Sequence, residues 1–182
     1  QADADAGSDD DICEGSTYTL SGTSASNNTG VSWTSSGTGT FAGSNTLTPT
    51  YNPSQLDVTA GSVTLTLTAT GISPCLDYSD DMVLTISPQA TTDAGPPDII
   101  CEGGTYTVTG ASSLNNTGVN WTHNGLGTLS GANTLTPTYT SLPNDGPSVI
   151  LTLTATGISP CPDVSDNMVL TISPDPTISL QP

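Results

Sequence analysis

Apolar and polar residues alternate along the chain with a period of two. In the segment Val63–Thr70, two leucines, one valine and one alanine face one way, and four threonines face the other. This pattern is typical of a β-strand with one buried and one solvated face. The same reasoning predicts further short strands, bounded by Gly, Asn, Ser or Pro, at Thr17–Leu20, Gly30–Thr34, Thr38–Phe41, Leu47–Tyr51 and Met82–Ile86, and a first strand before Cys13. We expect no helix.

The strand pattern occurs twice. Cys13–Tyr51 recurs as Cys101–Tyr139, and Ser62–Pro88 recurs as Ser148–Pro174. The connection between these segments shortens in the second copy, from residues 52–61 to residues 140–147, which predicts a surface loop. A unit of about 87 residues has the size of one small domain. The sequence therefore predicts domains at 1–88 and 89–174, followed by a linker or donor-like strand at 175–182.

About seven short strands per copy, separated by turn residues, predict an all-β fold. The expected architecture is two tandem immunoglobulin-like antiparallel β-sandwich modules of about seven strands each. Trp33 and Trp121 occupy matched positions on the third strand. We interpret them as central core residues; the alternative is an exposed platform on which sugars stack.

The charge balance excludes several partners. The chain has no Lys or Arg and 17 acidic residues, for a formal net charge of -17. Proteins hold phosphates with Lys and Arg, so no nucleic acid is expected as a partner.

No apolar run approaches about 18 residues, so direct membrane insertion is not expected either. No signal-peptide pattern is present, and we expect a mature protein or a fragment of one.

The four cysteines also fall at matched positions. Cys13 and Cys75 correspond to Cys101 and Cys161, and four cysteines allow three connectivities. Repeat symmetry favours the disulfides Cys13–Cys75 and Cys101–Cys161. Such bonds indicate an oxidising, extracellular or cell-surface location. The alternative is buried free thiols.

Several acidic residues recur in both copies and are candidate calcium ligands. No cofactor is required by the pattern, but calcium prefers carboxylate and carbonyl oxygens. The alternative is a structural role, in which these acids cap turns and keep the surface soluble. The candidate positions are Asp5, Asp10, Asp77 and Asp80 in the first copy and Asp93, Asp98, Asp163 and Asp166 in the second.

Three asparagines match the N-glycosylation pattern Asn-x-Ser/Thr. They are Asn27, Asn115 and Asn120, and the first two lie in equivalent loops. We expect glycans there first, although such short matches also arise by chance in a Thr-rich chain.

Catalytic chemistry is not expected. His123 is the single histidine, and its counterpart in the first copy is Ser35. A Ser-His-Asp arrangement would depend on this one residue, and the cysteines lack the C-x-x-C spacing of zinc sites. The sequence therefore predicts no enzyme and no catalytic residue.

The motifs as a set resemble a known family. Cys-Glu-Gly at 13–15 and 101–103, and Leu-Thr-Leu-Thr-Ala-Thr-Gly at 65–71 and 151–157, resemble the PKD-like or Ig-like tandem repeats of secreted Bacteroidetes surface proteins. Those large proteins are linked to gliding motility, adhesion and type IX secretion. The resemblance implies an extracellular β-sandwich with a structural or adhesive role and no catalytic residues.

The expected function is that of a non-enzymatic structural repeat in a surface filament, stalk or adhesin. Near-identical modules suggest head-to-tail assembly with copies of the same chain. The alternating segment Pro176–Leu180 could add a strand to a neighbour, or it could be the first strand of a third module. The alternative function is a glycan- or protein-binding adhesive module that acts through its sandwich loops.

Overall fold

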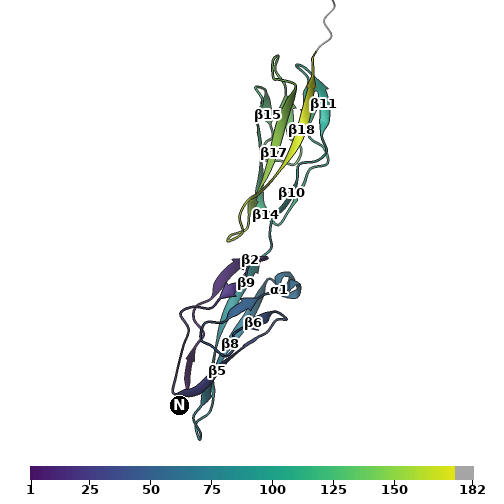
Figure 1. The fold of residues 1–182 in the computed structure, drawn as a ribbon. Helices are drawn as coiled ribbons and strands as arrows, with labels where there is room; N and C mark the ends of the chain where they lie inside the picture. Colours follow the sequence, from purple (N-terminus) through teal and green to yellow (C-terminus); the bar gives the residue numbers. More distant parts are fainter. Residues whose placement is uncertain (175–182) are drawn as a thin grey trace, which may run out of the picture. The chain divides into compact units, whose positions relative to one another are not determined.

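The chain forms two compact units in a computed structural model, which describes residues 1–174. Unit 1 comprises residues 1–89 together with residues 159–161, and unit 2 comprises residues 90–158 and the chain from residue 162. Within residues 1–174 each unit contains nine strands in the same order (Figure 1). The sequence repeat is therefore a structural repeat.

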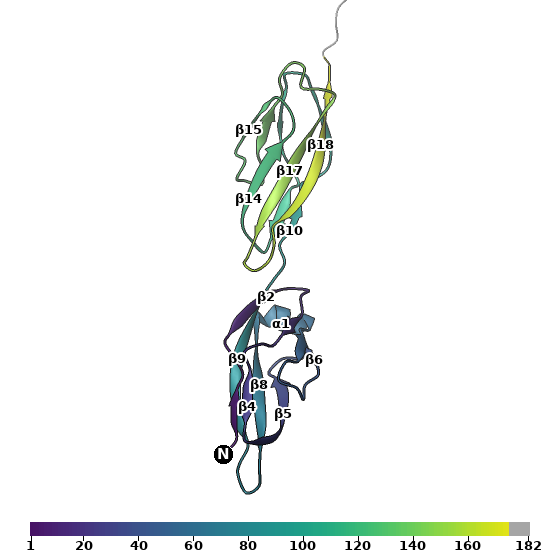
Figure 2. The same cartoon turned by 60° about the vertical axis from the view of Figure 1, so that its left-hand side comes forward.

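Unit 1 contains one large sheet and two small ones. The large sheet has the strand order β2-β9-β8-β5, a second sheet has the order β3-β7-β6, and β1 pairs with β4. Figure 2 shows β9, β8 and β5 side by side, with α1 and β6 beyond them. The bounds are β1 Asp3–Asp5, β2 Asp10–Cys13, β3 Tyr18–Thr19, β4 Ser24–Ser26, β5 Asn28–Ser35, β6 Thr40–Ala42, β7 Thr50–Asn52, α1 Gln55–Ala60, β8 Ser62–Gly71 and β9 Tyr78–Ser87.

Unit 2 repeats this arrangement. Its large sheet has the order β11-β18-β17-β14, the second sheet has the order β12-β16-β15, and β10 pairs with β13. The bounds are β10 Thr91–Asp93, β11 Asp98–Cys101, β12 Thr105–Thr107, β13 Ser112–Leu114, β14 Asn116–His123, β15 Thr128–Ser130, β16 Thr138–Thr140, β17 Ser148–Gly157 and β18 Val164–Ser173.

Most strand pairs are antiparallel, so the prediction of tandem antiparallel sandwiches is confirmed. Two details differ from expectation. The pair β1–β4 and its equivalent β10–β13 add two strands to the seven expected, because three-residue strands such as Asp-Ala-Asp carry almost no alternation. In addition, β2 pairs with β9 in parallel, as β11 does with β18.

The apolar face of the central strand forms the core of each unit. In β8 the four apolar residues from Val63 to Ala69 are buried, and the threonines between them are half-buried. The equivalent residues of β17 are buried in unit 2. Outside the core, hydroxyl pairs such as Thr68 with Ser79 (2.8 Å) join neighbouring strands. The period-two pattern therefore assigned the two faces correctly.

Both tryptophans are core residues. Trp33 is 4% exposed and Trp121 is 2% exposed. Each indole N–H donates to a carbonyl oxygen, that of Thr46 (3.1 Å) in unit 1 and that of Thr134 (3.0 Å) in unit 2. The core interpretation is confirmed, and the alternative of an exposed sugar-stacking platform is wrong.

The connector that varies in length contains a short helix in unit 1, so the expectation of no helix is wrong. Ser54 caps α1 at its N-terminus in a capping box with Asp57, and Gly61 ends the helix with a φ of 79°. Six residues are too few to show a clear helical period in the sequence, so the pattern of apolar residues did not predict this helix. The shorter connector of unit 2 forms a turn closed by the Asp145 N–H and the Leu142 carbonyl (3.1 Å).

Candidate functional site

Each of the eight predicted calcium ligands accepts a hydrogen bond from a backbone N–H. In unit 1 the donors to Asp5, Asp10, Asp77 and Asp80 are Gly7, Asp11, Gly71 and Ala6, at 2.8–2.9 Å. In unit 2 the donors to Asp93, Asp98, Asp163 and Asp166 are Gly95, Ile99, Gly157 and Ala94, at 2.8–3.0 Å. A chain without Lys or Arg thus uses its own amides to stabilise its recurring carboxylates.

These acids do not form one cluster. Asp5 and Asp10 line a shared pocket of about 390 Å³ in unit 1 together with Asp9, whereas Asp77 lies in the turn between β8 and β9. Among residues 1–174, no group of three or more His, Cys, Asp or Glu side chains is arranged to hold a metal ion. Calcium binding stays a prediction, with the pocket beside Asp5 as the first place to test.

A second pair of acids, which sequence reasoning missed, is buried in each unit. Asp57 is 2% exposed, and its Oδ2 accepts from the hydroxyl of Tyr51 at 2.9 Å. Its Oδ1 accepts from the Thr38 N–H (2.8 Å), and its Oδ2 also accepts from the N–H groups of Gly39 and Ser54 (2.9 Å each). Four donors therefore converge on one buried carboxylate.

Unit 2 contains the same corner. Asp145 is 8% exposed and accepts from the Tyr139 hydroxyl and from the N–H of Leu126. The sequence signal was a Tyr followed six residues later by an Asp in both copies, and each Asp lies in the connector whose total length differs between the copies. We call these two arrangements the Tyr–Asp corners, defined by Tyr51 with Asp57 and by Tyr139 with Asp145.

Hydrogen bonds decide the charge state of the Tyr–Asp corners. Burial raises the pKa of Asp57, but N–H donors from Ser54 and Thr38 and the Tyr51 hydroxyl outweigh burial and hold that pKa below its ordinary value. Burial, together with the neighbouring carboxylate of Asp145, raises the pKa of Tyr139 to about 12. Each corner is therefore an ionised carboxylate held by a neutral phenol.

A Gly-x-Gly turn makes room for each corner. A Cβ atom at Gly37 would lie 2.2 Å from Asp57 Oδ1, and one at Gly39 would lie 2.5 Å from the Tyr51 hydroxyl. In unit 2 a Cβ at Gly125 would lie 2.2 Å from the Tyr139 hydroxyl. The turn has no side chain because its backbone must approach the acid, so the corner serves to fasten the fold.

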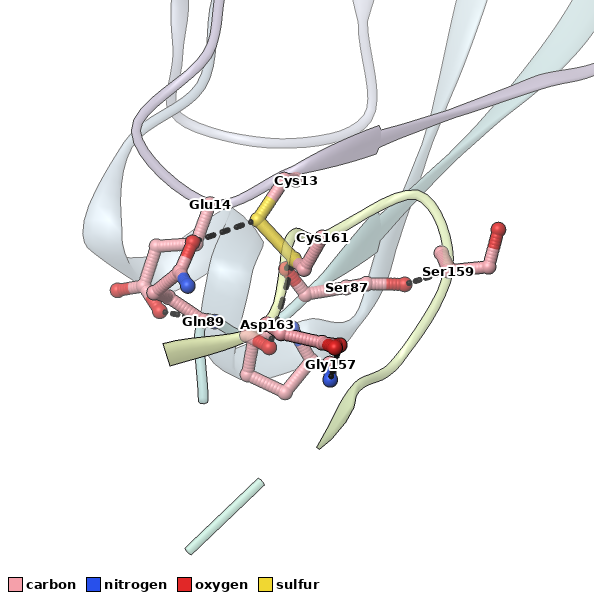
Figure 3. Close-up of a disulfide and its surroundings, with 9 residues drawn as sticks. Cys13, Glu14, Ser87, Gln89, Gly157, Ser159, Cys161 and Asp163 are labelled. Atoms are coloured by element: carbon pink, nitrogen blue, oxygen red, sulfur yellow. Dashed lines mark hydrogen bonds between the residues drawn. A yellow bond between two sulfur atoms is a disulfide. The ribbon is translucent and has the colours of Figure 1, made fainter. Parts of the chain in front are cut away.

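The disulfide of unit 1 joins Cys13, at the end of β2, to Cys161 (Figure 3). The two Cα atoms are 4.8 Å apart and 148 residues separate the cysteines in sequence. Cys75 and Cys101 are free and exposed. The predicted pairings Cys13–Cys75 and Cys101–Cys161 are therefore wrong.

The direction of β2 explains why the predicted disulfide Cys13–Cys75 does not form. Because β2 runs parallel to β9, Cys13 lies beside Ser87 at the end of β9. Cys75 precedes the start of β9 at Tyr78, so the length of that strand, roughly 30 Å at ~3.4 Å per residue, separates the two cysteines. A disulfide requires Cα atoms about 4.4–6.8 Å apart. Figures 1 and 2 show β2 and the β8–β9 turn at opposite ends of unit 1.

Backbone and side-chain contacts hold the disulfide in place (Figure 3). The Ser87 hydroxyl donates to the Ser159 carbonyl at 3.1 Å, and Sγ of Cys161 lies 3.4 Å from the Ser87 carbonyl oxygen. The Gln89 N–H donates to Glu14 Oε2 at 3.1 Å. We call this arrangement the cysteine clasp: Cys13 with Glu14 and Ser87 on one side, and the Ser159–Cys161 tip on the other.

The three candidate glycosylation sites lie on the surface. Asn27, Asn115 and Asn120 are all exposed. Asn27 and Asn115 have φ values of 52° and 53° at the entry to β5 and β14, a left-handed conformation that asparagine tolerates. Glycosylation itself stays a prediction.

The remaining candidates lie apart from one another. His123 is half-buried, and its ring contacts that of Tyr139 edge to face with the centroids 5.1 Å apart. The predicted donor segment Pro176–Leu180 lies outside the described residues. No helix within residues 1–174 is long and apolar enough to cross a membrane.

Known proteins match this chain in structure only. No protein-family model and no curated protein sequence matches it. The insect immune protein hemolin has a TM-score of 0.55 at 12% identity, over 92% of this chain and 46% of hemolin. A three-immunoglobulin structure of titin domains has a TM-score of 0.51 at 11% identity, over 95% of this chain and 66% of that one.

Immunoglobulin domains 1–4 of Sidekick-1 give a TM-score of 0.50 at 16% identity, over 94% of this chain and 49% of that chain. This chain therefore spans about half the length of hemolin and of the Sidekick-1 structure. At these identities the likeness shows the fold: both units are immunoglobulin-like.

Proposed function

We propose that this chain is a non-enzymatic structural repeat of an extracellular filament, stalk or adhesin, and that it assembles head to tail with copies of itself. Its role is mechanical. Sandwich units repeat along a row, and the cysteine clasp limits how far each chain can extend under load.

The observation that carries this proposal is the recurrence of structural contacts in both units. Both Tyr–Asp corners, both buried tryptophans and all eight backbone-bonded carboxylates recur at equivalent positions. By contrast, the potentially catalytic His123 occurs once. A scaffold that occurs twice without a shared reactive group fits a spacer better than an enzyme.

The structural neighbours support this role by analogy. Hemolin is an insect immune protein whose domain arrangement has implications for homophilic adhesion. Self-association of like-charged copies must overcome a charge of -17 on each chain. Added salt screens that repulsion, so assembly of this chain should strengthen as salt rises.

Sedimentation velocity and negative-stain electron microscopy test the proposal. The oxidised chain should form end-to-end rows that lengthen with protein concentration and with sodium chloride. A monomer at every concentration and salt level would contradict head-to-tail assembly. If that monomer bound a glycan array, the adhesive module that acts through its loops would be the better description.

A further inference from the structure

The two free cysteines, Cys75 and Cys101, lie at positions equivalent to the two bonded cysteines of the cysteine clasp. We call the Cys13 side of the clasp its receiving half and the Cys161 side its inserting half. Cys101 is the repeat equivalent of Cys13: β11 pairs with β18 in parallel so that Cys101 lies beside Ser173, as Cys13 lies beside Ser87. The Glu102 N–H donates to the Ser173 carbonyl at 2.8 Å, and the Glu14 N–H donates to the Ser87 carbonyl at the same distance. The receiving half is therefore already formed in unit 2.

The inserting half is already formed in unit 1. Cys75 lies at the β8–β9 tip, as Cys161 lies at the β17–β18 tip. Asp77 braces the first tip through the Gly71 N–H (2.8 Å), and Asp163 braces the second through the Gly157 N–H (3.0 Å). Both tips carry the sequence Gly-Ile-Ser-Pro-Cys.

The bonded cysteines are buried and the free cysteines are exposed. Cys13 and Cys161 are 8% and 7% exposed, whereas Cys75 and Cys101 are exposed to solvent. Beside Cys75, the apolar side chains of Ile72 and Leu76 are 53% and 80% exposed. Such apolar surface around a thiol, on a chain that holds the complementary half elsewhere, indicates a surface that a partner covers.

We propose that Cys101 of one copy forms a disulfide with Cys75 of the next copy, which repeats the clasp between chains. A second copy of the chain is the fitting partner because every copy carries both a receiving half at Cys101 and an inserting half at Cys75. The joint is heterologous, so it leaves one free half at each end and propagates as an open row. The inference rests on the proposed head-to-tail function and names its covalent joint.

The bond requires an oxidant, which we take to be a disulfide of the low-molecular-weight thiol class. The Cys101 thiolate attacks that disulfide and releases one thiol. The Cys75 thiolate of the next copy then attacks Sγ of Cys101 and releases the second thiol. Two protein thiols become one disulfide, and the reagent disulfide is reduced to two thiols, so atoms and electrons balance.

Complementary single variants test this joint. Cys75→Ser retains only the receiving half, and Cys101→Ser retains only the inserting half. With glutathione disulfide as the oxidant, non-reducing electrophoresis should show a ladder for the unaltered chain. An equimolar mixture of the two variants should stop at a dimer, because neither half remains free.

The rates of dimer formation give the decisive readout. The mixture should cross-link about tenfold faster than either variant alone, because a complementary surface raises the effective concentration of the two thiols. Thiol titration, with one free thiol per variant, and circular dichroism check that each variant is folded with Cys13–Cys161 intact. Peptide mapping with a Glu- or Asp-specific protease, since trypsin has no cleavage site, should yield a Cys75–Cys101 peptide.

Four outcomes would overturn the inference. Equal rates for the mixture and for each variant would indicate random thiol chemistry. A Cys75–Cys101 bond within a monomer would place the joint inside one chain. Rows that form equally well from the double variant Cys75→Ser/Cys101→Ser would leave the proposed function standing without this joint, whereas failure of all forms to associate would contradict both.

Discussion

The Tyr–Asp corner of unit 1 predicts a large loss of stability from a change of one atom. Asp57→Asn keeps the shape of the side chain but removes its charge and turns one acceptor into a donor. If the amide oxygen takes the place of Oδ2, the amide nitrogen faces the Thr38 N–H, which now bonds to Oδ1 at 2.8 Å. One buried donor then has no acceptor.

The magnitude follows from the hydrogen bonds that change. An unsatisfied buried donor costs about 1–3 kcal/mol. The three bonds to Oδ2, from Gly39, Ser54 and Tyr51, lose the strengthening that a charged acceptor gives. We expect Asp57→Asn to lower the free energy of unfolding by about 3–5 kcal/mol, the range for breaking a buried charged network.

Urea unfolding is the assay, because each unit carries one tryptophan. Trp33 reports on unit 1, and a Trp121→Phe background isolates its signal. Asp145→Asn is the matched change in unit 2, and it should destabilise unit 2 by a similar amount. Asp81→Asn, on the exposed face of β9, is the control and should change stability by less than about 0.5 kcal/mol.

The pH dependence supplies an independent check. Because the pKa of Asp57 is lowered in the folded state, its contribution is fully present above the ordinary value of about 3.9 and is lost as pH falls through the folded value. The stability gap between the unaltered chain and Asp57→Asn should therefore narrow below about pH 4. A loss of unfolding free energy below about 1 kcal/mol at pH 7 would refute the charged corner. A stability gap between the two proteins that does not change with pH would refute it as well.

Three further predictions concern the clasp and the surface. Cys13→Ser should lower the free energy of global unfolding by up to about 5 kcal/mol, because it opens a loop of 148 residues, whereas Cys101→Ser should leave urea unfolding unchanged. Native protein should exceed its bare sequence mass, with the excess on the Asn27 and Asn115 loops; equality of the two masses would eliminate glycosylation. Calorimetry with calcium chloride after chelation should show saturable binding that Asp5→Asn weakens, and a flat titration would eliminate the calcium prediction.

The period-two pattern predicted the sandwich correctly because it reports which side chain faces the core. Val63 to Ala69 alternate, and the structure buries that face. Alternation does not report the direction of a neighbouring strand. The sequence allowed Cys13 to lie at either end of β9, and only the parallel pairing places it far from Cys75.

The Tyr–Asp corners were missed for a different reason. Asp57 and Asp145 keep the offset of the first block, but they lie in the connector that the sequence analysis interprets as a surface loop. Asp5 and Asp93 recur at the same offset and make exposed turn contacts instead. Recurrence alone therefore does not separate surface acids from buried ones, because the distinction depends on which backbone amides converge on the carboxylate.

Pulling single chains from their two ends tests the mechanical account most directly. The cysteine clasp shields the residues between Cys13 and Cys161, so 182 residues less the 148 in the loop leaves 34 free to extend. The oxidised chain should lengthen to about 120 Å, and the reduced chain to about 650 Å, at ~3.6 Å per residue. An oxidised chain that reaches the reduced length, or about 220 Å as separate within-repeat disulfides would allow, would contradict the account.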